Sequence, residues 1–325
     1  MDQTNLKWQT FNGSLPNGAV SIYNEYVGRT DYVAKYGSTA GLYNPNKGPY
    51  CIYPYGLKEH RGSPFEILLN KDNFEILEWK DGSNGSVPDN AVETCPGSGI
   101  YVGKTQYGLG KVDVKNKSFY YPWEGSEHWE RSYQVLTVNK GVMRQEISDV
   151  MYKTAVKPIK SPVTLKKSVV TNNDCRSVKQ TTTLSETTQK TQRWDHNHSV
   201  TVGGNTTITT RIPLIFEGKI EINAGVIYQY STGITHSEST THNVAVEVNI
   251  PPNHSCCVSL VGYKYTADIP YTARLKRTYT NGKTSLTSIS GTYRSVQIGE
   301  VRGVVDRSTP VPNARPCPIK IALTL

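Results

Sequence analysis

The chain has 325 residues, of which 19% are charged and 10% aromatic, and its formal net charge is +9 at pH 7. A single hydrophobic core rarely serves more than about 250–300 residues, so this length predicts two domains. No run of about eighteen apolar residues occurs, which excludes a transmembrane helix, and six cysteines are too few for a disulfide scaffold. Their spacings match no zinc site, and the N-terminus shows no recognisable signal peptide.

An internal repeat occupies the first part of the chain. NGSLPNGAV at Asn12–Val20 returns as NGSVPDNAV at Asn84–Val92. YPYGLKEHRGSPFEIL, which begins at Tyr53, returns as YPWEGSEHWERSYQVL, which begins at Tyr121. Short runs of aromatic and β-branched residues between Gly, Pro and Asn are typical of antiparallel strands. Each copy is too small to cover its own apolar face, so we expect the two copies to pack as one pseudo-symmetric domain.

A third pair of blocks, YVGRT at 26–30 and YVGKT at 101–105, matches in the same way. The three pairs occur in the same order and at similar spacing, which places one copy at about 6–75 and the other at about 76–145. We therefore expect an N-terminal domain over residues 1–145 and a second domain over the rest of the chain, 146–325.

Charge divides the chain at the same boundary. Residues 1–145 carry 15 basic and 15 acidic side chains, whereas residues 146–325 carry 21 basic and 12 acidic ones. A basic half favours an anionic partner, either nucleic acid or a membrane surface. The basic residues are scattered among Thr and Ser rather than clustered with stacking aromatic residues, so we expect a membrane partner and no nucleic acid.

Strands and turns dominate the second half from Lys160 to Thr292, whereas MRQEISDVMYKTA from Met143 fits a helix or a strand equally well. The most regular part alternates between apolar residues at even positions and polar residues at odd positions. The even positions are Val200, Val202, Ile208, Ile212, Leu214, Phe216, Ile220 and Ile222, and the odd ones include Ser199, Thr201, Asn205, Thr207, Thr209, Arg211, Glu217, Lys219, Glu221 and Asn223. This period predicts a strand with one dry and one wet face.

The preceding stretch, SVKQTTTLSETTQKTQRW, is dominated by Thr, Ser, Gln and Lys. The combined segment is too polar for a sandwich core and too β-branched for a disordered linker. One interpretation is a solvated surface hairpin. The other is a hairpin that inserts into a membrane when several copies close a barrel, with the wet face towards the lumen and the dry face towards lipid. Two strands of about fifteen residues at about 3.3 Å each are long enough for a hydrocarbon core of about 30 Å.

On the second interpretation we expect an insertion hairpin at about 178–212, with its tip between Arg193 and Gly204. Arg211 is the expected lumen charge. His196 and His198 share a strand face without a third ligand nearby, so we expect no metal site. The residues assigned to the hairpin are Thr183, Ser185, Thr187, Trp194, His196, His198, Val200, Val202, Ile208 and Arg211.

Residues from about 150 to 325 resemble the aerolysin-type pore-forming module. The resemblance is carried by the Thr-rich stretch that leads to a strand at Pro213, by an Ile-Pro-Pro approach to a long strand at Cys257–Ala267, and by a late basic hairpin. That hairpin, RLKRTYTNGKTSLTSISGTY, contains Asn281-Gly282, a strong signal for a tight turn.

The first half resembles the DM-nine repeats of small mannose-binding lectins, through YVGRT and YVGKT, Glu59-His60 after Tyr53, and Glu127-His128 after Tyr121. A pair of DM-nine repeats followed by an aerolysin-type module is the arrangement of the natterin family. The resemblance implies a mainly β protein, with a pseudo-symmetric DM-nine domain followed by an elongated aerolysin-like β module.

The same resemblance implies a sugar pocket in each copy, in which an aromatic platform faces the ring and polar groups hold its hydroxyls. Gly110-Lys111-Val112 matches the family's Gly-Lys-Val, whereas the first copy reads GLYNPNKGPYC and offers only Lys47. The alternative for the repeated Glu-His pairs is that they hold their own loops. The expected carbohydrate-binding residues are Lys111, Tyr121, Trp123, Glu127 and His128, with Lys47, Tyr53, Glu59 and His60 in the other copy.

The implied function is a secreted, glycan-targeted pore-forming protein. Its lectin domain binds mannose-type glycans on cell surfaces, and its second domain forms a homo-oligomer that inserts a β-barrel. It needs no cofactor or metal. Two alternatives stay open: a lectin without pore activity, and the kinin-releasing protease activity attributed to natterins. The sequence lacks Gly-x-Ser-x-Gly, His-Glu-x-x-His and related motifs, so we expect no enzyme.

Overall fold

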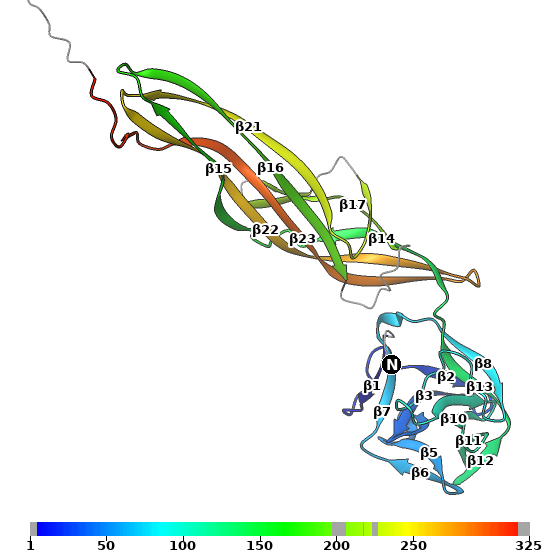
Figure 1. Ribbon diagram of the computed structural model, residues 1–325. Helices are drawn as coiled ribbons and strands as arrows, with labels where there is room; N and C mark the ends of the chain where they lie inside the picture. The colour runs from blue at the N-terminus through cyan, green and yellow to red at the C-terminus, as the bar shows by residue number, and fades with distance from the viewer. Residues whose placement is uncertain (1–4, 197–205, 217, 223–226, 318–325) are drawn as a thin grey trace, which may run out of the picture. The chain divides into compact units, whose positions relative to one another are not determined.

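The computed structural model describes residues 5–196, 206–216, 218–222 and 227–317 (Figure 1). These residues form strands almost throughout and no α-helix, which confirms the expected mainly β fold. The chain divides into two compact units. The first contains Met1–Ile147, His198–Thr206 and Arg274–Ile289, and the second contains Ser148–Asn197, Thr207–Ala273 and Ser290–Leu325. Within the described residues, no helix has the length and apolar character needed to cross a membrane.

Unit 1 contains a sheet of thirteen strands in the order β1-β7-β3-β4-β5-β6-β12-β11-β10-β9-β13-β8, with β2 paired to β3. Among the described residues, the 3₁₀ helix η1 (Pro45–Lys47) joins two strands of the first copy, and η2 (Lys71–Asn73) leads from the last strand of the first copy to the first strand of the second. The strands are β1 (Leu6–Thr10), β2 (Ser21–Asn24), β3 (Arg29–Tyr36), β4 (Thr39–Tyr43), β5 (Cys51–Tyr55), β6 (Lys58–Gly62), β7 (Glu66–Asn70), β8 (Leu77–Ser83), β9 (Ile100–Thr105), β10 (Gly108–Asp113), β11 (Ser118–Trp123), β12 (Ser126–Glu130) and β13 (Ser132–Val138).

The strand registers show how the two copies correspond. Ala34 on β3 pairs with Gly41, and Gly103 on β9 pairs with Gly110, so the β3–β4 hairpin is the counterpart of the β9–β10 hairpin. YVGKT on β9 therefore corresponds to YVAKY on β3, and its expected pairing with YVGRT is wrong, because YVGRT spans the turn between β2 and β3. A side chain at Gly41 or Gly110 would overlap the carbonyl oxygen of the adjacent strand, so the close backbone approach requires glycine in both copies.

One apolar core joins the two copies. Val33, Leu42 and Leu68 of the first copy pack with Val102 and Leu136 of the second, and all are almost completely buried. Smaller clusters lie within each copy, around Phe65 in the first and Phe119 in the second. The core that the two copies share agrees with their expected packing as one domain.

Unit 2 is built on a nine-stranded sheet in the order β20-β17-β14-β22-β23-β16-β21, with β15 and β24 paired to β22, and on a separate two-stranded sheet of β18 and β19. Figure 1 shows β16, β21, β22 and β23 running side by side. The strands are β14 (Val142–Tyr152), β15 (Ile159–Asn172), β16 (Val178–His196), β17 (Thr206–Thr210), β18 (Pro213–Phe216), β19 (Lys219–Ile222), β20 (Tyr228–Ser231), β21 (His236–Ile250), β22 (His254–Tyr279), β23 (Thr284–Val305) and β24 (Thr309–Pro310).

The turn between β22 and β23 forms at Asn281-Gly282 as predicted: Gly282 has φ +79°, and the Asn281 side chain accepts the Lys283 amide at 3.1 Å. This turn belongs to unit 1. The Lys283 ammonium lies 2.9 Å from the Glu78 carboxylate and lowers its pKa. MRQEISDVMYKTA, which fits either a helix or a strand, contains most of β14.

One disulfide joins Cys175 to Cys317, whose Cα atoms are 5.4 Å apart. It fixes the C-terminal segment to the end of unit 2, where the Asn253 side chain also donates to the Arg315 carbonyl oxygen at 2.9 Å. The pairing was not predictable from the sequence, because six cysteines at irregular spacings allow many connectivities.

Candidate functional site

Lys111 and Glu127, both expected to bind sugar, contact each other within the second copy and also contact the first copy. The Lys111 ammonium lies 3.5 Å from the Glu127 carboxylate and donates to the Pro54 carbonyl oxygen at 3.1 Å. Glu127 also accepts the Leu57 amide at 2.7 Å. The two side chains are only 10% and 8% exposed, and the ammonium lies 5.5 Å from the ring centre of Tyr55. These contacts tie β10 and β12 of the second copy to the β5–β6 hairpin of the first.

This pair gives a stability prediction. We expect Glu127→Ala to lower the free energy of unfolding by about 3 kcal/mol, because it leaves the buried Lys111 ammonium without its counter-ion. The matched control is Glu59→Ala, since the residue of the first copy that corresponds to Lys111 is Leu42. That change should cost less than about 1 kcal/mol. Chemical denaturation measures both values, and equal losses would contradict a structural role for the Lys111–Glu127 pair.

Four of the other expected sugar residues form one Tyr–His stack in each copy. Tyr53 stacks on His60 with ring centres 5.5 Å apart, and Tyr121 stacks on His128 at 5.6 Å. Trp123 is half-buried. Burial and the nearby Glu130 raise the pKa of Tyr121 to about 12, so this phenol stays neutral at physiological pH.

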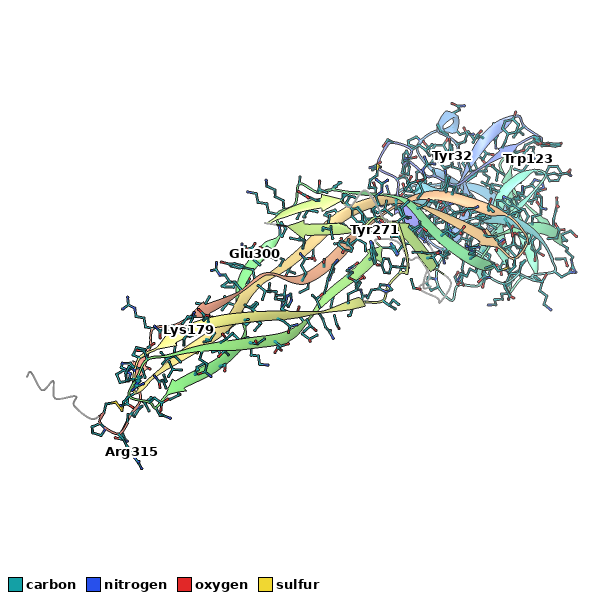
Figure 2. All side chains as sticks on the ribbon, turned by 90° about the horizontal axis from the view of Figure 1, so that it is seen from above. Tyr32, Trp123, Lys179, Tyr271, Glu300 and Arg315 are labelled. Atoms are coloured by element: carbon teal, nitrogen blue, oxygen red, sulfur yellow. A yellow bond between two sulfur atoms is a disulfide. The ribbon has the colours of Figure 1, made fainter. Side chains whose placement is uncertain are left out.

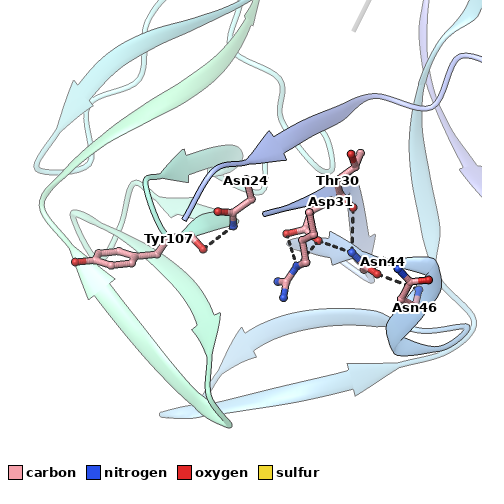
Figure 3. A network of polar contacts seen from close by, with 7 residues as sticks. Asn24, Thr30, Asp31, Asn44, Asn46 and Tyr107 are labelled. Carbon is pink, nitrogen blue, oxygen red and sulfur yellow. Dashed lines mark hydrogen bonds and ion pairs between the residues drawn. The ribbon is translucent and has the colours of Figure 1, made fainter. Parts of the chain in front are cut away.

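Lys47 lies in a loop that a buried network holds in place (Figure 3). The completely buried Asp31 carboxylate accepts from the Arg29 guanidinium at 2.9 Å and from the Asn44 amide at 2.9 Å. Asn44 in turn caps η1 by accepting the Asn46 amide at 3.0 Å. Lys47 itself is exposed, and the structure does not bring it together with Tyr53, Glu59 or His60 through any contact among the described residues.

In unit 2, the Thr-rich strand β16 pairs with β21. The ladder runs without a break from Val178 opposite Ile250 to Gln192 opposite His236. Of the expected hairpin residues, Thr183, Ser185 and Thr187 all lie on the exposed face of β16, and the buried Leu184 lies on the other. Lys179 marks the start of this face in Figure 2 and forms an ion pair with Glu247 on β21 at 2.7 Å.

Trp194, near the end of β16, is completely buried. Its ring stacks on Tyr230 at 4.9 Å, and its indole donates to the Tyr152 hydroxyl at 2.9 Å. His196 hydrogen-bonds the Tyr271 hydroxyl at 2.7 Å, and Tyr271 is labelled in Figure 2. Burial raises the pKa of Tyr152 to about 12. These side chains hold the end of β16 against β14, β20 and β22.

The two arms expected at 178–212 do not pair with each other among the described residues. β17, which holds the completely buried Ile208, pairs with β20, and β18 pairs with β19 across residues 217–218. Arg211 is exposed. His198, Val200 and Val202, like most of the expected tip, lie outside the described residues.

The segment HSESTTHNVAVEVNI, which forms β21, was not expected in this region, although it alternates in the same way as β16. Alternation along a strand shows which of its faces is polar, but it does not identify the strand with which it pairs. The paired parts of β16 and β21 are separated in the sequence by the long connection 193–235. Among the residues that the structure describes, no group of three His, Cys, Asp or Glu side chains has the arrangement of a metal site.

Comparison with known proteins shows the family. A model of the DM9 repeat matches residues 20–108. Natterin-3 of Thalassophryne nattereri is 47% identical over 97% of this chain and 87% of its own length, and Natterin-2 is 45% identical over 98% and 85%. The crystal structure of lamprey immune protein superposes with a TM-score of 0.45 at 14% identity, covering 94% of this chain and 99% of that one. Identity above two-fifths over nearly the whole length shows that the chain is a member of the natterin family.

Proposed function

We propose that the chain is a secreted, glycan-targeted pore-forming protein, whose residues 193–235 extend the β16–β21 ladder into a membrane-spanning hairpin. The observation that carries the proposal is the register of that ladder. Leu184 pairs with Val244 and Gln192 with His236, and the same register continued pairs Ile208 with Ile220. The turn would then consist of residues 213–215.

This register collects the apolar residues of both arms on one face. Antiparallel pairs in it join even to even positions, and the odd positions are polar apart from Ile227 and the turn. An outward apolar face and a polar lumen are what a transmembrane barrel needs. The apolar face consists of Trp194, Val200, Val202, Ile208, Ile212, Phe216, Ile220, Ile222, Val226, Tyr228, Tyr230 and Ile234.

The soluble structure covers much of this face. Trp194 and Ile208 are 0% exposed, Ile212 4% and Ile220 9%. Moving four such side chains into water would cost about 6–12 kcal/mol, so release from the sheet has to be coupled to transfer into lipid. The side-chain amide of Gln297 on β23 donates to the Ile215 carbonyl oxygen at 2.6 Å. In the soluble form, this hydrogen bond would hold the residues that become the turn of the inserted hairpin.

In this proposal, the DM9 domain directs the chain to its target surface. Binding mannose-type glycans would raise the local concentration of the chain on a surface, which favours the encounters that close a ring. The Cys175–Cys317 disulfide supports secretion, because disulfides persist in oxidising compartments. The protein would act by binding and insertion rather than by catalysis.

Release of a dye from liposomes tests the proposal. Vesicles that carry mannosylated lipid should leak at lower protein concentration than vesicles without it, and detergent extracts should contain rings of the chain. Sealed vesicles of both kinds at every concentration would leave a lectin without pore activity. Leakage that does not depend on the glycan would remove the lectin half of the proposal and keep the pore half.

A further inference from the structure

Unit 1 contains a cavity of about 400 Å³ that lies between the two copies and does not include Lys111. Its floor is formed by Leu6, Leu68, Val92 and Val138. Trp8 and Tyr101, both half-buried, line its walls, and Asp89, Asn90, Glu93 and Lys140 contribute the polar groups. The volume is at the lower end of the range of about 300–1,000 Å³ that small-ligand pockets occupy.

The apolar residues that line the cavity have counterparts in the other copy, so their presence is explained by the fold of the repeat. Val92 donates its amide to Leu136 at 2.8 Å, just as Val20 donates to Leu68 at 2.9 Å. The blocks NGSVPDNAV and NGSLPNGAV keep the proline, alanine and valine of this loop in both copies. An apolar frame alone is therefore no evidence of a ligand.

The polar groups are not repeated. Asp89 and Asn90 of the second copy correspond to Asn17 and Gly18 of the first. The two loops follow the same path, because the Asn90 carbonyl oxygen accepts from Val138 at 3.0 Å and that of Gly18 accepts from Asn70 at 2.8 Å.

Asn90 keeps a left-handed backbone conformation, with φ +60°, where the first copy has glycine at φ +83°. A side chain rarely adopts this region without a cost of about 1 kcal/mol or more. At Gly18 a Cβ atom would lie 2.7 Å from the Asn70 carbonyl oxygen, so the first copy has no room for one. The second copy thus carries an amide at a position where the repeat itself favours glycine.

The other polar groups are also suited to a ligand. Glu93 is held in place, since its carboxylate accepts the amides of Gly97 at 3.1 Å and Gly99 at 2.9 Å. Within the part of the chain that the structure describes, no hydrogen bond or ion pair engages the side chains of Asp89 and Lys140. Two carboxylates, an amide and one ammonium disfavour an anionic ligand and offer acceptors and donors for hydroxyl groups.

We propose that this cavity is a single carbohydrate subsite, distinct from the Lys111 region, which takes one neutral sugar ring of a surface glycan. The apolar face of the ring lies against Trp8 or Tyr101, and its hydroxyls bond Asp89 and Asn90. The inference rests on the proposed function, because it names a site for the glycan that directs the chain to its target.

Isothermal titration of the full chain with the methyl glycosides of mannose, galactose and N-acetylglucosamine tests this site. At least one glycoside should bind, and Asp89→Ala should weaken its Kd at least tenfold, which corresponds to about 1.4 kcal/mol. The matched control is Asn17→Ala, the equivalent exposed position of the first copy, and it should leave the Kd unchanged. Both variants should keep the melting temperature of the parent, since both residues lie at the surface.

Three outcomes would overturn the inference. If a glycoside binds and Asp89→Ala leaves its Kd unchanged, or if Lys111→Met abolishes binding without lowering the melting temperature, the sugar is bound elsewhere and the proposed function survives. If both Asp89→Ala and Asn17→Ala weaken binding equally, the site is not single. If none of the three glycosides binds, the subsite and the lectin half of the proposed function both fail, while dye release still tests the pore half.

Discussion

We expect a disulfide between β16 and β23 to abolish the membrane leakage that this protein causes, and we expect reduction of that disulfide to restore the leakage. Thr191 and Val296 lie opposite each other in the β16–β23 ladder, and both are half-buried. Opposed residues of antiparallel strands have Cα atoms about 4.5–5.5 Å apart, within the range that a disulfide bridges. In the proposed inserted state the end of β16 leaves β23, so the double variant Thr191→Cys, Val296→Cys would hold the chain in its soluble form.

The matched control is a disulfide that the proposal allows. Thr187 on β16 and Thr241 on β21 are opposed, exposed and joined by a hydrogen bond of 2.9 Å between their hydroxyls. Because the proposal keeps β16 and β21 paired on insertion, Thr187→Cys, Thr241→Cys should leak like the parent when oxidised. Dye release measures both variants in a background with Cys95→Ser and Cys257→Ser, and the parent is treated with the same reductant because it contains Cys175–Cys317. Full leakage by the oxidised β16–β23 variant would contradict the proposed release.

A charge on the lipid face should nearly abolish leakage, whereas a charge on the lumen face should not. Ile222 is half-buried and Glu221 is exposed, and they are neighbours on β19 that point to opposite faces. In the proposed hairpin Ile222 would face lipid, where an arginine near the midplane costs about 2–4 kcal/mol in each copy. We expect Ile222→Arg to raise the protein concentration for half-maximal dye release at least tenfold, since the cost recurs in every subunit of the ring.

The paired variant Glu221→Arg introduces the same side chain at the adjacent position. Its expected effect is normal leakage with ion selectivity shifted towards anions, because the lumen would gain positive charge. Single-channel recordings in a salt gradient give the reversal potential that reports this shift. Equal loss of leakage in both variants, with unchanged melting temperatures, would show that β19 does not alternate between lipid and lumen.

Much of the fold was predictable because the chain repeats itself. The blocks from Tyr53 and Tyr121 predict paired sheets, and the shared core confirms that the two copies pack together. The register of the repeat was harder to predict, since YVGRT shares four of its five residues with YVGKT, while the hairpins equate YVGKT with YVAKY. A sequence comparison aligns the segments whose residues are most alike. In the fold, the corresponding segments are those with the same hydrogen-bond pairing between strands.

The candidate sites were less predictable, because their partners come from distant parts of the chain. Nothing near Lys111 in the sequence indicates that Pro54 and Glu127 engage its ammonium. Likewise, the Thr-rich pattern of β16 indicates a strand with a wet face, but its pairing with β21 depends on closing a long connection. The alternation in the sequence therefore predicted which segments form amphipathic strands. It did not predict which of these strands pair with each other.

We propose an inserted state in which the even positions of β19 face lipid and its odd positions face the lumen. Its most direct test places an environment-sensitive fluorophore on single cysteines at 219, 220, 221 and 222, in a background without the free cysteines, in the presence of vesicles. We expect blue-shifted emission at Ile220 and Ile222, quenched by nitroxide lipids, and emission at Lys219 and Glu221 that aqueous iodide quenches. Emission that is the same at all four positions, or unchanged by vesicles, would contradict it.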